Sequence, residues 1–233
     1  PLWSRGLGDV YKRQVLSVPV GGLPAIPSGT DFGHIMDLTL VGLRLPALPP
    51  GFLSLFPNLQ RLDLSRNSMH AMPQGLETLP QLRYLHLASN RIRMTEPHVN
   101  ALAHLASLRT LDLSGNPLGS INLRIHRLSR LRELHLYRAG LQVVPEGLEW
   151  CGLLEYADLR YNQISSLPPS LIDAPLAVRQ RVLVDGNALS AADRERLYAV
   201  QPPLGDLQGE EADLLRARTC LLYTSDAADD LLC

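Results

Sequence analysis

A nine-residue pattern recurs along most of this chain and constrains its fold more than any other feature. Residues 59–67, LQRLDLSRN, carry leucine at the first, fourth and sixth positions and asparagine at the ninth. The frame returns at residues 82–90, 108–116 and 154–162, and in weaker form at 35–43, 131–139 and 179–187. Successive ninth positions are separated by 24, 23, 26, 23, 23 and 25 residues. Such a regular period indicates a stack of similar structural units.

The pattern resembles the leucine-rich repeat, whose units stack into a solenoid. The resemblance predicts an α/β fold with short parallel strands on the concave face, irregular or short helical segments on the convex face, and a C-terminal capping helix. The alternating leucines are expected to face inward. Leu43 and Ala139 stand where asparagine is expected, so the backbone there needs other partners. The ninth-position asparagines, expected to bind backbone groups at the bend, are Asn67, Asn90, Asn116, Asn162 and Asn187.

Domain boundaries follow from the repeat frame. Ser190 and Asp193 resemble a capping box at the start of a helix, and Thr95 followed by Pro97 predicts a capped convex helix in the longest unit. The predicted order after the first tail is an irregular lead-in over 15–34, a domain of about seven repeats over 35–189, a capping helix over 190–203, and a linker over 204–219 into a missing domain.

Both ends of the chain are predicted to be foreign to the repeats. Lys12 is the only lysine among 22 basic residues. Residues 9–14 (DVYKRQ) can be encoded by GATGTGTATAAGAGACAG, whose reverse complement encodes residues 220–225 (CLLYTS) in another frame. This relation is explained if the two ends were encoded by the two complementary strands of one oligonucleotide. The two peptide sequences resemble a translated transposon-type sequencing adapter. Residues 1–14 and 220–233 are therefore interpreted as adapter-derived tails.

Composition excludes several classes of protein. The chain has 233 residues, a net charge of -1 and 45% hydrophobic residues, which is ordinary for a globular protein. No apolar run suits a membrane span or a signal peptide. Binding to nucleic acid would need an excess of basic residues, which this chain lacks. Three cysteines are too few for a disulfide framework. We expect a monomer that contacts neither membrane nor nucleic acid.

The outward side chains of the predicted strands form the candidate binding face. One column across the strands alternates acid and imidazole, with Asp63, His86 and Asp112 at its centre, and the neighbouring columns contain Tyr and Arg. Because Tyr and Arg dominate binding hot spots, a protein partner is predicted on the concave face; the alternative is a merely solvated sheet. The candidate residues are Tyr84, His86, His135, Tyr137, Arg138, Tyr156, Asp158, Arg160 and Tyr161.

No catalytic or metal-binding site is predicted inside the repeats. Cys151 lies three residues before Leu154, where other units carry apolar residues, so it is expected in the core. Metal binding or pH-modulated partner binding by the acid and imidazole column remains an alternative, but no second shell or closed pocket is indicated. The sequence predicts no cofactor, no metal and no catalytic residue.

Four short segments of the chain resemble sequences of a narrower family. They are DFGHI at 31–35, FLSLFPNL at 52–59, LDLSGNPL at 111–118 and LVDGNALS at 183–190. They are similar to the repeat region of bacterial effector-like proteins that continue into a novel-type E3 ubiquitin ligase domain. The resemblance covers most of 32–201. It implies a module that selects substrate or restrains the ligase, whose catalytic cysteine lies downstream and has no match here.

The same resemblance implies a virulence protein of the bacterial cytoplasm that is secreted into the host cell cytoplasm. The alternative is a stand-alone interaction scaffold with no link to ubiquitin. A cysteine in a helical domain beyond Thr219 would separate these two hypotheses.

Overall fold

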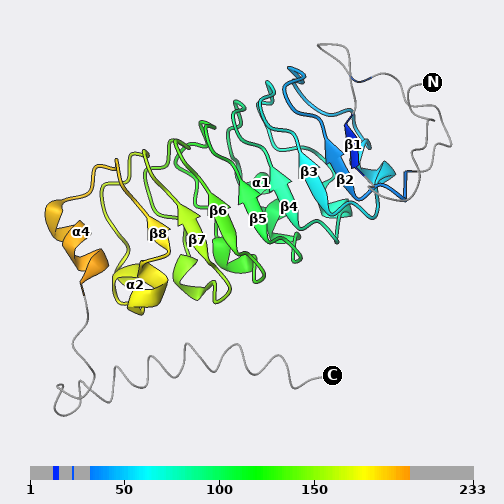
Figure 1. Cartoon of the computed structure of the whole chain (residues 1–233). Coiled ribbons are helices and arrows are strands. Elements are labelled where there is room, and N and C mark those ends of the chain that lie inside the picture. The colour runs from blue at the N-terminus through cyan, green and yellow to red at the C-terminus, as the bar shows by residue number, and fades with distance from the viewer. Residues whose placement is uncertain (1–12, 16–22, 24–31, 200–233) are drawn as a thin grey trace, which may run out of the picture. The chain divides into compact units, whose positions relative to one another are not determined.

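One parallel sheet organises the described part of the chain. The computed structural model describes residues 13–15, 23 and 32–199, and the chain divides into compact units at 1–197 and 198–233, of which only the first is described below. The strands pair in chain order (Figure 1). They are β1 (Arg13–Val15), β2 (Asp37–Thr39), β3 (Arg61–Asp63), β4 (Tyr84–His86), β5 (Thr110–Asp112), β6 (Glu133–His135), β7 (Tyr156–Asp158) and β8 (Val182–Leu183).

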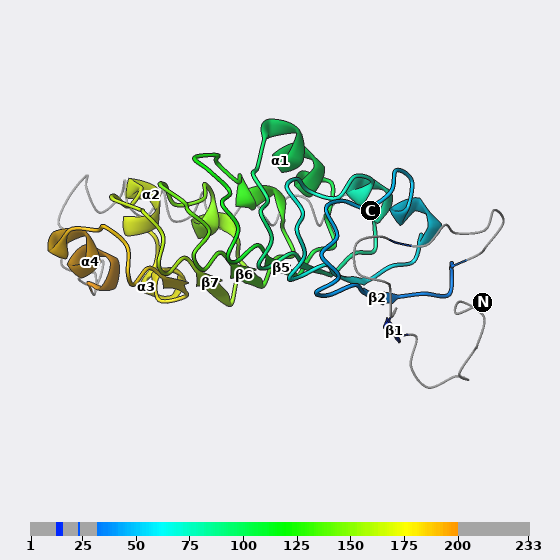
Figure 2. The same ribbon diagram turned by 90° about the horizontal axis from the view of Figure 1, so that it is seen from above.

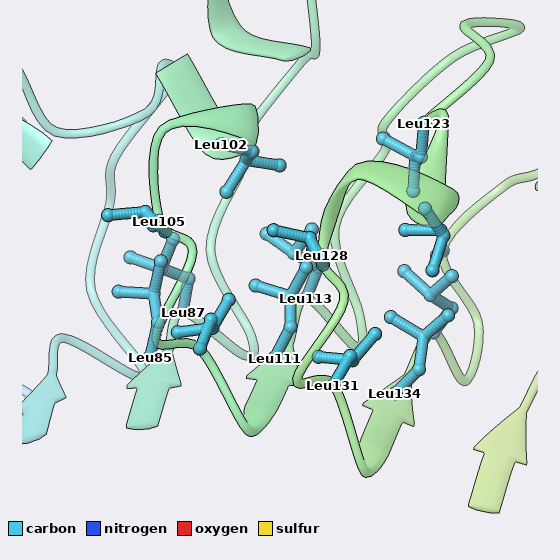
Figure 3. Packing of buried hydrophobic residues seen from close by; sticks show 14 of the residues in the cluster. Leu85, Leu87, Leu102, Leu105, Leu111, Leu113, Leu123, Leu128, Leu131 and Leu134 are labelled. Atoms are coloured by element: carbon cyan, nitrogen blue, oxygen red, sulfur yellow. The ribbon is translucent and has the colours of Figure 1, made fainter. Parts of the chain in front are cut away.

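The repeat frame sets the register of the sheet. Leu62, Leu85 and Leu111, the fourth positions of successive units, are direct partners on β3, β4 and β5. All three side chains are buried, while the flanking strand positions face the other way. Figure 3 shows Leu111 and Leu113 pointing inward toward leucines of the returning segments. The predicted parallel solenoid is therefore confirmed.

The helices in the returning segments are short because proline and tight turns interrupt them. Among the returning segments that the structure describes, only α1 (Glu96–Ala103) forms a longer helix. It begins after Thr95 as predicted, and the Thr95 N–H donates to Nδ1 of His98 at 3.2 Å. Helices α2 (Pro169–Ile172) and α3 (Leu176–Arg179) are single turns. Figure 2 shows these segments beside the row of strands. The other returning segments contain 3-10 turns at Leu53–Leu55, Leu76–Thr78, Ile125–Arg127 and Leu148–Trp150.

The asparagine ladder satisfies the backbone at the bends. The side-chain amide of Asn116 donates to the carbonyls of Leu87 and Leu113 at 2.9 and 3.0 Å. Its Oδ1 accepts from the Ile92 N–H at 3.0 Å. One side chain thus ties together two adjacent units, and Asn67, Asn90, Asn162 and Asn187 make equivalent bonds.

Ala139 shows how the fold tolerates a missing asparagine. In the other units, the N–H equivalent to that of Leu118 donates to the asparagine of the next unit. Here the Leu118 N–H donates instead to the backbone carbonyl of Ala139 at 3.1 Å and to that of Asn116 at 2.9 Å. At the other exception, the Leu43 N–H donates to Oδ1 of Asn67 in the next unit at 3.0 Å. Backbone groups and the following unit therefore supply the partners at both places.

A helix covers the last repeat. Helix α4 (Ala191–Tyr198) begins inside the range predicted for the capping helix. Oγ of Ser190 accepts from the Asp193 N–H at 3.0 Å, which is one of the two bonds of a capping box. The Ser190 hydroxyl, and not its backbone N–H, donates to Asp193 Oδ2 at 2.8 Å. Leu197 turns into the core.

Some sequence predictions fall on residues that the structure does not describe. These are residues 1–12, residues 16–22 and 24–31 of the predicted lead-in, residues 200–219, and the predicted tail 220–233. Strand β1 crosses the predicted boundary between residues 14 and 15 and pairs with β2, so Arg13 and Gln14 take part in the sheet. No helix among the described residues is long and apolar enough to cross a membrane.

Candidate functional site

The outward columns of the sheet lie as the repeat frame predicts. His135 is paired in register with Asp112 on one side and Asp158 on the other. The aspartates have a local structural role, since Oδ1 of Asp112 accepts from the N–H of Ser114, two residues on, at 2.9 Å. Asp63 and Asp158 make the same turn-closing bond. The carboxylates of this column are therefore partly occupied by their own backbone.

Asp158 is the centre of a closed polar network. It is only 5% exposed, and Arg160 donates through Nε to Oδ1 at 2.9 Å and through Nη2 to Oδ2 at 2.7 Å. The Tyr156 hydroxyl adds a bond to Oδ2 at 3.2 Å. This bidentate pair uses the guanidinium fork, so Arg160 is already engaged before any partner arrives.

The network shifts the pKa of each member. Burial alone would raise the pKa of Asp158, but the hydrogen bonds and charge of Arg160 outweigh it and hold that pKa below its usual value. Burial and the Asp158 charge raise the pKa of the Tyr156 phenol. The carboxylate raises the pKa of Arg160. The patch therefore presents an ionised pair and a protonated phenol at neutral pH.

Two tyrosine rings flank a second arginine where the strands end. Tyr137 and Tyr161 meet edge to face with ring centroids 5.2 Å apart. The guanidinium carbon of Arg138 lies 5.3 Å from one ring centroid and 5.5 Å from the other. Tyr161 packs over Gly186, where an added Cβ would lie 2.8 Å from its ring. Unlike Arg160, Arg138 has no carboxylate partner among the described residues.

Seven of the nine candidate residues lie together. His135 lies 5.5 Å from the ring of Tyr156 and 3.5 Å from the Glu133 carboxylate, and Arg160 lies 6.0 Å from Tyr137. We call the group formed by these seven the C-terminal concave patch. It consists of His135, Tyr137, Arg138, Tyr156, Asp158, Arg160 and Tyr161.

Tyr84 and His86 lie apart from that patch, on β4. The Arg61 guanidinium lies 4.3 Å from the Tyr84 ring centroid, and Nε2 of His86 is shielded with no hydrogen-bond partner among the described residues. Thr110 stands at an outward strand position but is only 5% exposed, and its hydroxyl donates to Glu133 at 3.4 Å. It is buried because it is small and lies between the larger Tyr84 and Glu133.

The described residues contain one cysteine, which is buried, and no cluster of metal-ligating side chains. Cys151 is buried as predicted, its thiol donates to the carbonyl of Gly147 at 3.4 Å, and burial raises its pKa to about 12. The thiol is therefore protonated at neutral pH. No group of three His, Cys, Asp or Glu side chains is placed to hold a metal ion within 13–15, 23 and 32–199.

Sequence reasoning missed two arginines that follow strand β4 near the N-terminal end of the stack. Arg91 and Arg93 lie just beyond the nine-residue frame, so comparison of the frame positions alone passed over them. Aligning the loops after the strands would have revealed them.

These features define a class: a leucine-rich-repeat solenoid, with a parallel sheet, a buried asparagine ladder and short convex segments. Leucine-rich-repeat family models match residues 33–92 and 107–128. The chain therefore carries leucine-rich repeats.

Known proteins with similar repeats come from animals and bacteria. Mouse podocan is 34% identical over 166 residues, covering 69% of this chain and 23% of podocan. Zebrafish leucine-rich repeat protein SHOC-2 is 41% identical over 51 residues, covering 22% of this chain and 9% of SHOC-2. The chain thus spans less than a quarter of either relative.

Solved structures agree with the fold. A leucine-rich-repeat protein of Leptospira interrogans superposes with a TM-score of 0.59 at 27% identity, covering 69% of this chain and 40% of that one. An internalin of Listeria monocytogenes gives a TM-score of 0.54 at 19% identity, covering 69% and 43%, which supports the fold alone.

Proposed function

We propose that this chain is a protein-recognition module that binds its partner through the C-terminal concave patch. The observation that carries this proposal is the continuity of the patch. Its members come from adjacent strands and the bends after them, and they touch one another through ring and guanidinium contacts. Large aromatic surface combined with arginine is the composition of a binding hot spot.

A protein surface suits this patch better than a small molecule. A concave sheet offers area but little enclosure, whereas small-molecule sites bury most of their ligand. Tyr161 is 53% exposed although its ring is held by Tyr137 and Gly186. A large, fixed and exposed ring loses little freedom on binding, which favours affinity.

Tyr137→Ala tests the proposal. The chain is used to capture partners from lysate, and the affinity of an identified partner is then measured. We expect the substitution to weaken binding by about 2 kcal/mol without unfolding the repeats, because Tyr137 fills no core position. Trp150→Ala is the matched control, an exposed aromatic residue in a returning segment. Loss of binding in the control with retention in the Tyr137 variant would contradict the assignment.

The resemblance of residues 52–59 and 183–190 to effector repeats supports a narrower proposal. In it, the chain is the substrate-recognition or autoinhibitory region of a bacterial E3 ubiquitin ligase, made in the bacterial cytoplasm and secreted into host cells. The alternative is a stand-alone scaffold acting as a monomer, and neither podocan nor SHOC-2 is named a ligase. Reading the gene beyond Thr219 tests this: a catalytic cysteine in a helical domain supports the ligase, and a stop codon opposes it.

A further inference from the structure

Positive charge is concentrated on one edge of the stack. The loops that follow β2, β3 and β4, residues 40–47, 64–71 and 87–94, contain no Asp or Glu, although the whole chain has a net charge of -1. They contain four arginines and a histidine. We call this set the basic edge; it consists of Arg44, Arg66, His70, Arg91 and Arg93.

Backbone hydrogen bonds stack these three loops on one another. The Arg91 N–H donates to the carbonyl of Met69 at 2.9 Å, and the Arg93 N–H donates to that of His70 at 3.1 Å. The loop after β3 is joined to the loop after β2 in the same way, through the Ser68 N–H and the carbonyl of Leu45 at 3.0 Å. The basic edge is therefore one surface built from three stacked loops.

The side chains of the basic edge face solvent. Arg91 and Arg93 alternate with the buried Ile92 and Met94, so both project away from the core. Arg44, Arg66 and His70 are exposed as well. The four arginines make no ion pair with any described residue, whereas Arg61, Arg124, Arg132 and Arg160 each face a carboxylate. Their charge is thus left for an external anion.

The basic edge is continuous with the C-terminal concave patch. Arg66 and Arg138 hold the same repeat position, three units apart. The row between them contains Ser89 and Gly115, which are joined by hydrogen bonds from strand to strand, including the Gly115 N–H to the Tyr137 carbonyl at 2.8 Å. A single polypeptide lying along this row would reach both regions.

We propose that the basic edge binds an acidic segment of the protein partner, with Asp or Glu carboxylates seated on Arg66, Arg91 and Arg93. The proposal rests on the proposed function, because the segment belongs to the same partner. Arginine suits this role since its planar fork accepts a carboxylate in a bidentate manner. Charge complementarity in such an arrangement supplies specificity and fast association.

The experiment uses the full chain and a hexaglutamate peptide, with a hexaglutamine peptide of equal length as the uncharged probe. Binding is followed by NMR titration at low and high salt. We expect saturable shifts with hexaglutamate only, and weaker binding as salt screens the charges. Arg91→Gln combined with Arg93→Gln should weaken binding by about tenfold. Arg127→Gln combined with Arg130→Gln removes the same charge from exposed positions elsewhere and should leave it within about twofold.

Three results would overturn the proposal. They are equal weakening in both double variants, unchanged binding in the Arg91 and Arg93 variant, and tighter binding of a single-stranded oligonucleotide than of hexaglutamate. The probe is a peptide and not the partner itself. Failure of the Tyr137 test therefore leaves this measurement standing, and failure here leaves the concave-patch test standing.

Discussion

At the scale of single residues, Arg179 is the clearest departure from the repeat. It occupies the first leucine position of the last unit and is 1% exposed. Its guanidinium donates to the carbonyls of Ala174, Arg196 and Leu197 at 2.9, 2.7 and 2.9 Å. Carbonyls at a helix C-terminus lack partners within the helix and favour a cation. The residue therefore fastens α4 to the last repeat.

Arg179→Met should destabilise the fold by about 2–5 kcal/mol, because the carbonyls at the end of α4 lose a charged donor in a buried place. Chemical denaturation measures the change. Arg181→Met, a half-exposed position two residues later, should stay within about 0.5 kcal/mol. Equal losses would show that the bonds of Arg179 to the helix contribute nothing specific.

Asp158 gives a pH-dependent prediction at the same scale. Its pKa is lowered in the folded chain because the bonds from Arg160 outweigh burial. Its stabilising contribution is therefore present above the unfolded pKa of about 3.9 and is lost as pH falls through the folded value. The melting temperature of the wild type should exceed that of Asp158→Asn at neutral pH, and the difference should shrink below about pH 4. A pH-independent difference would oppose this account.

At the scale of elements, no strand of this sheet has a core of its own. Strand β5 is three residues long, and its central Leu111 is fully buried because β4 and β6 lie on either side and the returning segments cover it. Nearest-neighbour stacking of this kind makes the stability of each unit depend on the adjacent ones.

Leu111→Ala should therefore cost about 2–5 kcal/mol through lost burial and a residual cavity. Ser114→Ala, on the outward side just after the same strand, should cost less than about 1 kcal/mol. Urea denaturation of both variants checks the inward and outward assignment. Similar losses would mean that the register is wrong.

At the scale of the molecule, the stack separates its chemistry by position in the repeat. Leucines fill the inside and asparagines bind the bends, while the outward columns carry Tyr, Arg, Asp and His. The basic edge and the C-terminal concave patch lie on the surface produced by this arrangement, so both can change without loss of the core.

Removal of residues 1–12 and 220–233 should shift the melting temperature by no more than about 4 °C, since these words were interpreted as adapter-derived. Residues 13–15 are retained because they form β1 against β2. Extending the deletion through Val15 is the comparison, because it removes the strand paired with β2. A large loss from the shorter deletion would contradict the interpretation of the tails.

The sequence by itself determined the solenoid, its register and its outward columns. Buried strands must repeat their apolar positions, and an asparagine such as Asn67 or Asn116 can bind two adjacent units only from one position of the repeat. It did not determine the burial of Thr110, the occupation of the Arg160 fork by Asp158, or the substitution of the Ala139 carbonyl for an asparagine. Tertiary structure decided these, since each depends on the size and reach of side chains and backbone in the neighbouring unit. The role of Arg179 was settled in the same way, by a helix that the repeat period does not describe.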